Sequence, residues 1–132
     1  MNRVDYSSKK IPSANSVMSA NKFDDFFNNL ALDLIEAGDE YGFNGTTSIS
    51  SSHNSGDQLT DNEWQGLILN VENALSEVFH DDIGENLDNS FIQLMTSLRA
   101  LDAGDEIKWT DWNQLVESIQ SKMNQIIDYF EN

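Results

Sequence analysis

The sequence predicts an all-α protein in which four helices form an antiparallel bundle. The first observation is the spacing of apolar residues, which recur every three or four positions in four segments, as they do on helix faces that pack together. The second is the presence of capping residues and glycines at the ends of these segments. The clearest segment spans residues 109–130, and its apolar positions are Trp109, Trp112, Val116, Ile119, Met123, Ile126 and Phe130.

The chain has 132 residues, which is the length of one domain. Residues 1–20 are rich in Ser, Asn and Lys, and we expect them to form a flexible basic tail. Residues 21–132 form the predicted acidic helical domain. An alternative for the tail is that it folds back onto the acidic body at low ionic strength, where charges are screened least.

The first helix is predicted over residues 22–37. Asn21 is its expected N-cap, and Gly38 follows the last periodic position, as a left-handed C-terminal cap would. Its inner stripe consists of Phe23, Phe27, Leu30, Leu34 and Ala37. Residues 39–59 have no helical period and include a run of Ser and Thr, so we expect a long mobile loop between the first two helices.

The second helix is predicted to begin at Thr60, because Thr60 and Glu63 have the spacing of a capping box. Gly66 lies inside this helix, where glycine costs about 1 kcal/mol relative to alanine. We expect Gly66 to make room for a neighbouring side chain.

Residues 80–86 are expected to form a turn, and the third helix is expected over residues 87–103, with Gly104 as its cap. The fourth helix is predicted to begin at residue 109 or 110 and to end near residue 130. Its polar positions are expected to face water, and they are Asn113, Glu117, Gln120, Lys122 and Asp128.

Residues 37–40 and residues 103–106 share the sequence Ala-Gly-Asp-Glu. The apolar positions around the two segments also match, once a difference of 18 residues is assigned to the Ser-rich loop. One interpretation is a duplication that produced two helix–turn–helix repeats, the first with an insertion. The alternative is chance, because capped helical stripes resemble one another.

The charge is strongly negative, with 23 acidic and 7 basic side chains and a formal net charge of −16. No Lys or Arg occurs between residues 23 and 98, where Asp and Glu occur 15 times. Such a field repels nucleic acid and anionic lipid and attracts basic protein surfaces, although acidity that serves only solubility is the alternative. No apolar run approaches the ~20 residues of a membrane span. We therefore expect neither direct nucleic-acid binding nor membrane insertion.

Signals for catalysis are weak. The chain has no cysteine, no Gly-x-Ser-x-Gly elbow and no Gly-rich phosphate loop. His53 is expected to be a solvated loop residue, while His80 and the acids after it lack the spacing of an EF-hand. Trp64 and Trp112 are expected to be core anchors on helical stripes. We therefore expect no enzyme, no bound metal and no cofactor.

The leading functional hypothesis is a non-catalytic module that covers or neutralises a basic partner protein, in the manner of an immunity protein or a DNA mimic. The expected contact residues are acids of the first two helices and of the turn after them: Asp24, Asp25, Asp33, Glu36, Asp61, Glu63, Glu72, Glu77, Asp81, Asp82 and Glu85.

The alternative is an exported helical subunit or an acidic chaperone of a bacterial secretion or assembly machine, with the N-terminal tail as its export signal. The first hypothesis implies a cytoplasmic monomer or homodimer. The second implies export by a specialised system without a cleaved signal peptide.

Overall fold

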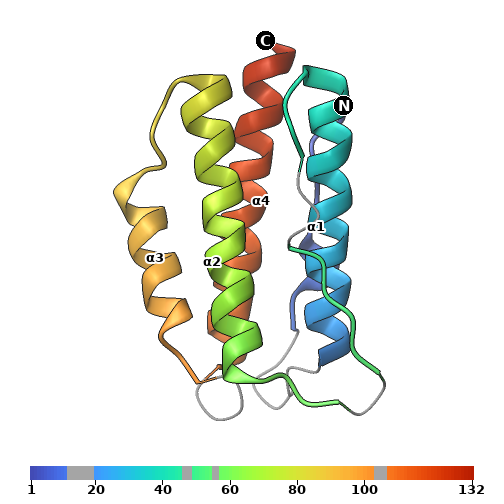
Figure 1. The fold of residues 1–132 in the computed structure, drawn as a ribbon, viewed down its shortest axis with the longest axis vertical. Coiled ribbons are helices and arrows are strands. Elements are labelled where there is room, and N and C mark those ends of the chain that lie inside the picture. The colour runs from blue at the N-terminus through green and yellow to red at the C-terminus, as the bar shows by residue number, and fades with distance from the viewer. Residues whose placement is uncertain (12–19, 46–48, 55–56, 103–106) are drawn as a thin grey trace.

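The computed structural model describes residues 1–11, 20–45, 49–54, 57–102 and 107–132. Within these residues the protein has four α-helices and no β-strand, which confirms the all-α fold class (Figure 1). The helices are α1 (Ala20–Tyr41), α2 (Asp61–Glu77), α3 (Asn89–Arg99) and α4 (Trp109–Glu131). A short 3-10 helix, η1 (Ser7–Lys9), precedes α1, and a π-helical segment, η2 (Val78–Ile83), continues α2. None of the described helices has the length and apolar character needed to cross a membrane.

Three of the four helices run in the same direction, and only α3 runs the opposite way (Figure 1). At one end, the rings of Phe23, Trp64 and Trp112 lie 6.1–6.4 Å apart, and each belongs to the first turn of its helix. At the other end, Tyr41 of α1 stacks on Phe130 of α4 with ring centroids 4.9 Å apart. The structure therefore differs from the antiparallel bundle that we expected, because helical periodicity carries no information about direction.

The parallel course of α1 and α2 also differs from a helix–turn–helix repeat, in which the two helices run in opposite directions. The described parts of residues 42–60 return along the length of the molecule before α2 begins (Figure 1). Residues 103–106, the second copy of the repeated sequence, lie outside the described residues, as does the cap predicted at Gly104.

Residues 1–11, which we call the strap, pack between α1 and α4. Tyr6 and Ile11 are each 1% exposed, and η1 contacts both helices. The strap runs from the C-terminal ends of α1 and α4 toward their N-terminal ends, so it is antiparallel to both (Figure 1). This arrangement differs from the flexible tail that we expected for these residues. The rest of that tail, residues 12–19, lies outside the described residues.

α1 continues through Gly38 and ends at Tyr41, and the left-handed residue after it is Gly42, with a φ of 85°. Gly38 is therefore not the helix cap. It allows the following turn to cross the helix, because a Cβ on Gly38 would lie 2.5 Å from the carbonyl oxygen of Phe43. Gly45 makes the same contact from the other side, since its Cβ would lie 2.7 Å from the Cα of Ile35.

The predicted capping box begins α2. The backbone N–H of Glu63 donates to Thr60 Oγ1 at 3.2 Å, and the backbone N–H of Thr60 donates to Glu63 Oε1 at 3.1 Å. Helical structure then continues through η2 to Gly84, which has a φ of 84°, so most of the turn predicted over residues 80–86 is helical. α3 is shorter than the predicted 87–103 and starts after Asp88, whose carboxylate accepts the N–H of Phe91 at 3.0 Å.

The indole rings of Trp64 and Trp112 are fully buried, as expected for core anchors. Each also satisfies its polar atom: Trp64 Nε1 donates to the carbonyl oxygen of Leu98 at 2.7 Å, and Trp112 Nε1 donates to that of Lys9 at 2.8 Å. The first bond ties α2 to α3, and the second ties α4 to the strap. Both tryptophans therefore connect segments that are far apart in the sequence.

We expect Gly38→Ala to destabilise the protein and Gly66→Ala to stabilise it. A Cβ on Gly66 would meet no atom within 4 Å, so this glycine does not make room for a neighbour, contrary to our expectation from the sequence. Gly66→Ala should gain about 1 kcal/mol from helix propensity, whereas overpacking at Gly38 should cost about 1–3 kcal/mol. Urea unfolding of both variants beside the wild type measures the two effects. Equal effects would contradict the crossing of α1 by residues 43–45.

Candidate functional site

The structure does not gather the eleven predicted contact acids on one face. Seven of them interact within the chain: Asp24, Asp25, Asp33, Asp61, Glu63, Glu72 and Asp81. The other four have no hydrogen bond or ion pair with the described residues, and they are Glu36, Glu77, Asp82 and Glu85. Asp24 is buried and faces the interior, so the structure removes it from the surface on which we expected it.

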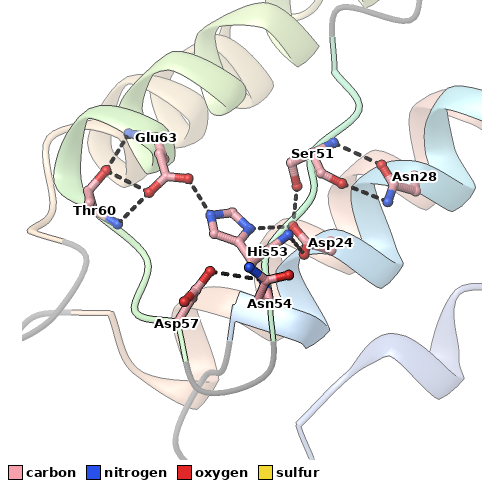
Figure 2. Close-up of polar contacts among 8 residues, drawn as sticks. All are labelled: Asp24, Asn28, Ser51, His53, Asn54, Asp57, Thr60 and Glu63. Carbon is pink, nitrogen blue, oxygen red and sulfur yellow. Dashed lines mark hydrogen bonds and ion pairs between the residues drawn. The ribbon is translucent and has the colours of Figure 1, made fainter.

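Asp24 belongs to a partly buried polar cluster that joins α1, residues 51–53 and the start of α2 (Figure 2). The ring of His53 lies between two carboxylates: Nδ1 is 2.7 Å from Asp24 Oδ1, and Nε2 contacts Glu63 Oε2. The backbone N–H of His53 also donates to Asp24 Oδ2 at 2.7 Å, and the Ser51 hydroxyl donates to Asp24 Oδ1. We call Asp24, Ser51, His53 and Glu63 the carboxylate clasp.

Residue Asn28, one helical turn after Asp24, holds the same loop by its main chain. Its side-chain amide donates to the carbonyl oxygen of Ser51 at 2.8 Å, and its amide oxygen accepts the N–H of Ser51 at 2.8 Å (Figure 2). At this point the Ser-rich loop is therefore docked on α1 through both backbone and side-chain contacts.

The geometry around His53 favours the positively charged form of its ring. Both ring nitrogens face a carboxylate, and both are donors only in the imidazolium form. The hydrogen bond to Asp24 raises the pKa of His53 above its ordinary value, burial opposes this shift, and the bond to Glu63 adds to it. Burial would raise the pKa of Glu63, but hydrogen bonds from Thr60 and His53 lower it. The clasp therefore buries a cation between two anions.

The clasp is not arranged for nucleophilic catalysis, because the Ser51 hydroxyl donates to Asp24 and not to the imidazole. In the part of the chain that the structure describes, no group of three or more His, Asp or Glu side chains is placed to hold a metal ion. His80 lies on the surface, where Nδ1 is 2.8 Å from Asp81 Oδ1. The chemistry of the clasp is therefore charge neutralisation that ties a loop to two helices.

The burial of His53 was missed from the sequence, where we expected a solvated loop residue. Its side chain is only 7% exposed. One signal was present: between residues 23 and 98, His53 and His80 are the only side chains that can carry positive charge. Asp24 directly follows Phe23, which lies on the inner stripe of the first helix. An acid that is buried beside this stripe needs a cation nearby.

A second charged feature lies where the C-terminal ends of α1, η2 and α4 come together (Figure 1). The last turns of α1, α2 and α4 contain no Lys or Arg. Carboxylates lie instead in the last two turns of α1, α2 and α4, in η2 and just after η2, and we call them the acidic pole: Glu36, Asp39, Glu40, Glu77, Asp81, Asp82, Glu85, Asp128 and Glu131. Because helix C-termini carry partial negative charge, these acids add to three dipole ends of the same sign.

Few cations offset the pole. The N-terminal ammonium of Met1 lies 2.7 Å from Glu40 Oε1 and 3.4 Å from Glu131 Oε2, and Arg3 pairs with Asp128. The exposed side chain of His80 contacts Asp81. Glu36, Glu77, Asp82 and Glu85 are members of the pole, so the four predicted contact acids that have no hydrogen bond or ion pair with the described residues all belong to it.

No protein-family model, curated protein or solved structure matches the chain.

We expect the carboxylate clasp to stabilise the fold most between pH 4.5 and pH 6.5, the ordinary pKa values of Glu and His. Because the pKa of His53 is raised, its contribution is complete below 6.5 and is lost as the pH rises through the raised value. Because the pKa of Glu63 is lowered, its contribution is complete above 4.5 and is lost as the pH falls through the lowered value. Urea unfolding from below pH 4.5 to above pH 6.5 measures the profile.

The matched variants for this profile are His53→Gln and His80→Gln. His53→Gln should lower the free energy of unfolding at neutral pH and remove the decline on the alkaline side. His80→Gln should leave both unchanged, because His80 is on the surface. An alkaline decline that persists in His53→Gln would contradict the role given to the clasp.

Proposed function

We propose that this protein is a non-catalytic binding module whose acidic pole covers a basic surface of a partner protein. The observation that carries the proposal is the alignment of three helix C-termini with nine carboxylates and without Lys or Arg in the last turns of these helices. In the most specific form of this proposal, the protein neutralises its partner as an immunity protein or a DNA mimic does. Its carboxylates then lie in the places where phosphates would lie.

The physical reason is that the pole is an unfavourable arrangement for the free protein. Acids near helix C-termini oppose the helix dipole, whereas Lys and Arg would be favourable there. Like charges at short range also repel one another. A cationic partner offsets both unfavourable interactions when it binds, so relief of the repulsion contributes to the free energy of binding. Such association is fast and is weakened by salt.

The alternative function is an exported subunit or an acidic chaperone of a secretion machine, and the exported subunit requires that residues 1–20 be accessible as a recognised tail. Residues 1–11 instead pack against α1 and α4, with Tyr6 and Ile11 in the core. These contacts favour the binding module over the exported subunit. A cytoplasmic location goes with the favoured proposal and stays a prediction.

Two double variants of equal net charge test the pole. Glu36→Gln with Glu77→Gln removes two charges from the pole, and Asp61→Asn with Asp111→Asn removes two from the N-terminal turns of α2 and α4. The probe is a labelled oligo-lysine peptide, titrated at increasing NaCl concentration. We expect the pole variant to bind about two- to thirtyfold more weakly than the wild type, since it loses two exposed charge pairs that contribute about 0.2–1 kcal/mol each.

The control variant should bind like the wild type, and circular dichroism should show that both variants are folded. If both variants lose affinity equally, only the net charge of the protein matters, and the pole is not a binding surface. If binding does not weaken as salt is added, the proposal fails as a whole.

A further inference from the structure

The strap lies along a single face of α4. The polar positions on this face are four, three, four, four and three residues apart, and they are Asn113, Glu117, Gln120, Asn124, Asp128 and Glu131. Every one of them contacts the strap. Four of these six positions were expected to face water, and the strap instead covers the face along its length.

Three of these side chains bind the main chain of the strap. Asn113 accepts the N–H of Ile11 at 2.7 Å and donates to its carbonyl oxygen at 2.8 Å. Asn124 accepts the N–H of Val4 at 2.7 Å and donates to its carbonyl oxygen at 3.0 Å, and Gln120 accepts the N–H of Tyr6 at 2.7 Å. Contacts of this kind provide affinity for any extended segment, while side-chain pockets provide specificity.

Two side chains of the strap provide the specificity. Tyr6 and Ile11 are each 1% exposed. The ring of Tyr6 packs edge-on against Phe26 with centroids 5.5 Å apart, and its hydroxyl donates to Asp33 Oδ2 at 2.7 Å. The site therefore accepts an aromatic residue with a polar tip, followed five positions later by an aliphatic residue.

Charge at the margins selects a basic segment. Lys9 pairs with Asp25 at 2.8 Å, Lys10 pairs with Glu117, and Arg3 pairs with Asp128. One member of each pair is more than 60% exposed, so each pair contributes little to the stability of the fold. The strap is thus held at its margins by exchangeable interactions.

We propose that the strap site, formed by this face of α4 together with Asp25, Phe26 and Asp33 of α1, is a peptide-binding site. In the free protein its own strap fills it. A basic segment of the partner, with an aromatic anchor and an aliphatic anchor five residues apart and Lys or Arg between them, takes the place of the strap in the complex.

The exchange is balanced because the incoming segment makes the same kinds of contact that the strap gives up. The strap has the advantage of a high effective concentration, since it is covalently attached. The inference rests on the proposed function, because a partner that also contacts the acidic pole would offset that advantage. Asp128 and Glu131 belong to both the pole and the strap site, so the two surfaces are continuous.

The test uses a labelled synthetic peptide with the sequence of residues 1–11, titrated into three full-length proteins. The first is the wild type. The second is Lys9→Glu with Lys10→Glu, which places like charges opposite Asp25 and Glu117 and so weakens the attached strap. The third adds Asn113→Ala and Asn124→Ala to the second and so removes four of the main-chain contacts.

We expect the peptide to bind the second protein at least about tenfold more tightly than it binds the wild type, because the apparent affinity rises with the fraction of open sites. The third protein should lose this gain. A peptide of the same composition with Tyr6 and Ile11 exchanged with the serines at positions 7 and 8 should bind weakly to all three. Arg3→Glu, at an exposed margin, replaces the second protein if circular dichroism shows that the second protein does not fold.

Equal binding to the wild type and to the weakened-strap variant would overturn the proposal, and so would equal binding of the rearranged peptide, which would show charge attraction alone. A concentration-dependent dimer of the weakened-strap variant would overturn the assignment to a partner and indicate a second copy of the chain instead. The Glu36→Gln, Glu77→Gln variant distinguishes the two proposals. If the weakened-strap protein does not bind the peptide, while the binding of oligo-lysine still depends on the acidic pole, only the strap-site proposal is rejected.

Discussion

The contact on which the rest of the structure depends is the meeting of three aromatic side chains, one from the first turn of each parallel helix. Phe23, Trp64 and Trp112 are fully buried and lie within 6.4 Å of one another. Burial of large aromatic side chains supplies much of the energy of a small core. Because all three belong to helix starts, their association forces α1, α2 and α4 to run in the same direction.

Parallel helices require that the chain return between them, and here the loop before α2 returns from α1 while α3 returns from η2 toward α4 (Figure 1). The described parts of residues 42–60 return from the end of α1 to the start of α2, and Asp24 with His53 holds them near their far end. The strap fills the space between α1 and α4. The loop and the strap are both fastened by side chains that bind main-chain atoms, which are Asn28 for the loop and Asn113, Gln120 and Asn124 for the strap.

The same parallel arrangement sets the charge distribution. At the helix starts, Glu63 and Asp111 accept backbone N–H groups, where negative charge is favourable. At the helix ends, the acids of the pole lie against dipoles of the same sign, and the sequence supplies few cations there. The only buried imidazole, His53, neutralises acids at the opposite end of α1, so it does not relieve the pole.

Local features could be predicted from the sequence, and features that depend on direction could not. The apolar stripes and the Thr60–Glu63 capping box involve residues close in sequence, and the structure contains them. Asn113 and Asn124 could not be assigned, because a polar stripe looks the same whether it faces water or another main chain. Gly38 was misread for a related reason, since a glycine that caps a helix and one that a crossing turn requires look alike in sequence.

The most direct test of the account is the relative direction of α1 and α4. The chain has no cysteine, so pairs of engineered cysteines can be spin-labelled without background. One pair replaces Asp39 and Tyr129, and the other replaces Asp39 and Trp109. Parallel helices predict a short distance for the first pair and a distance of about 30 Å, a 20-residue helix length, for the second. The reverse order of the two distances would contradict the aromatic contact, the strap site and the acidic pole together.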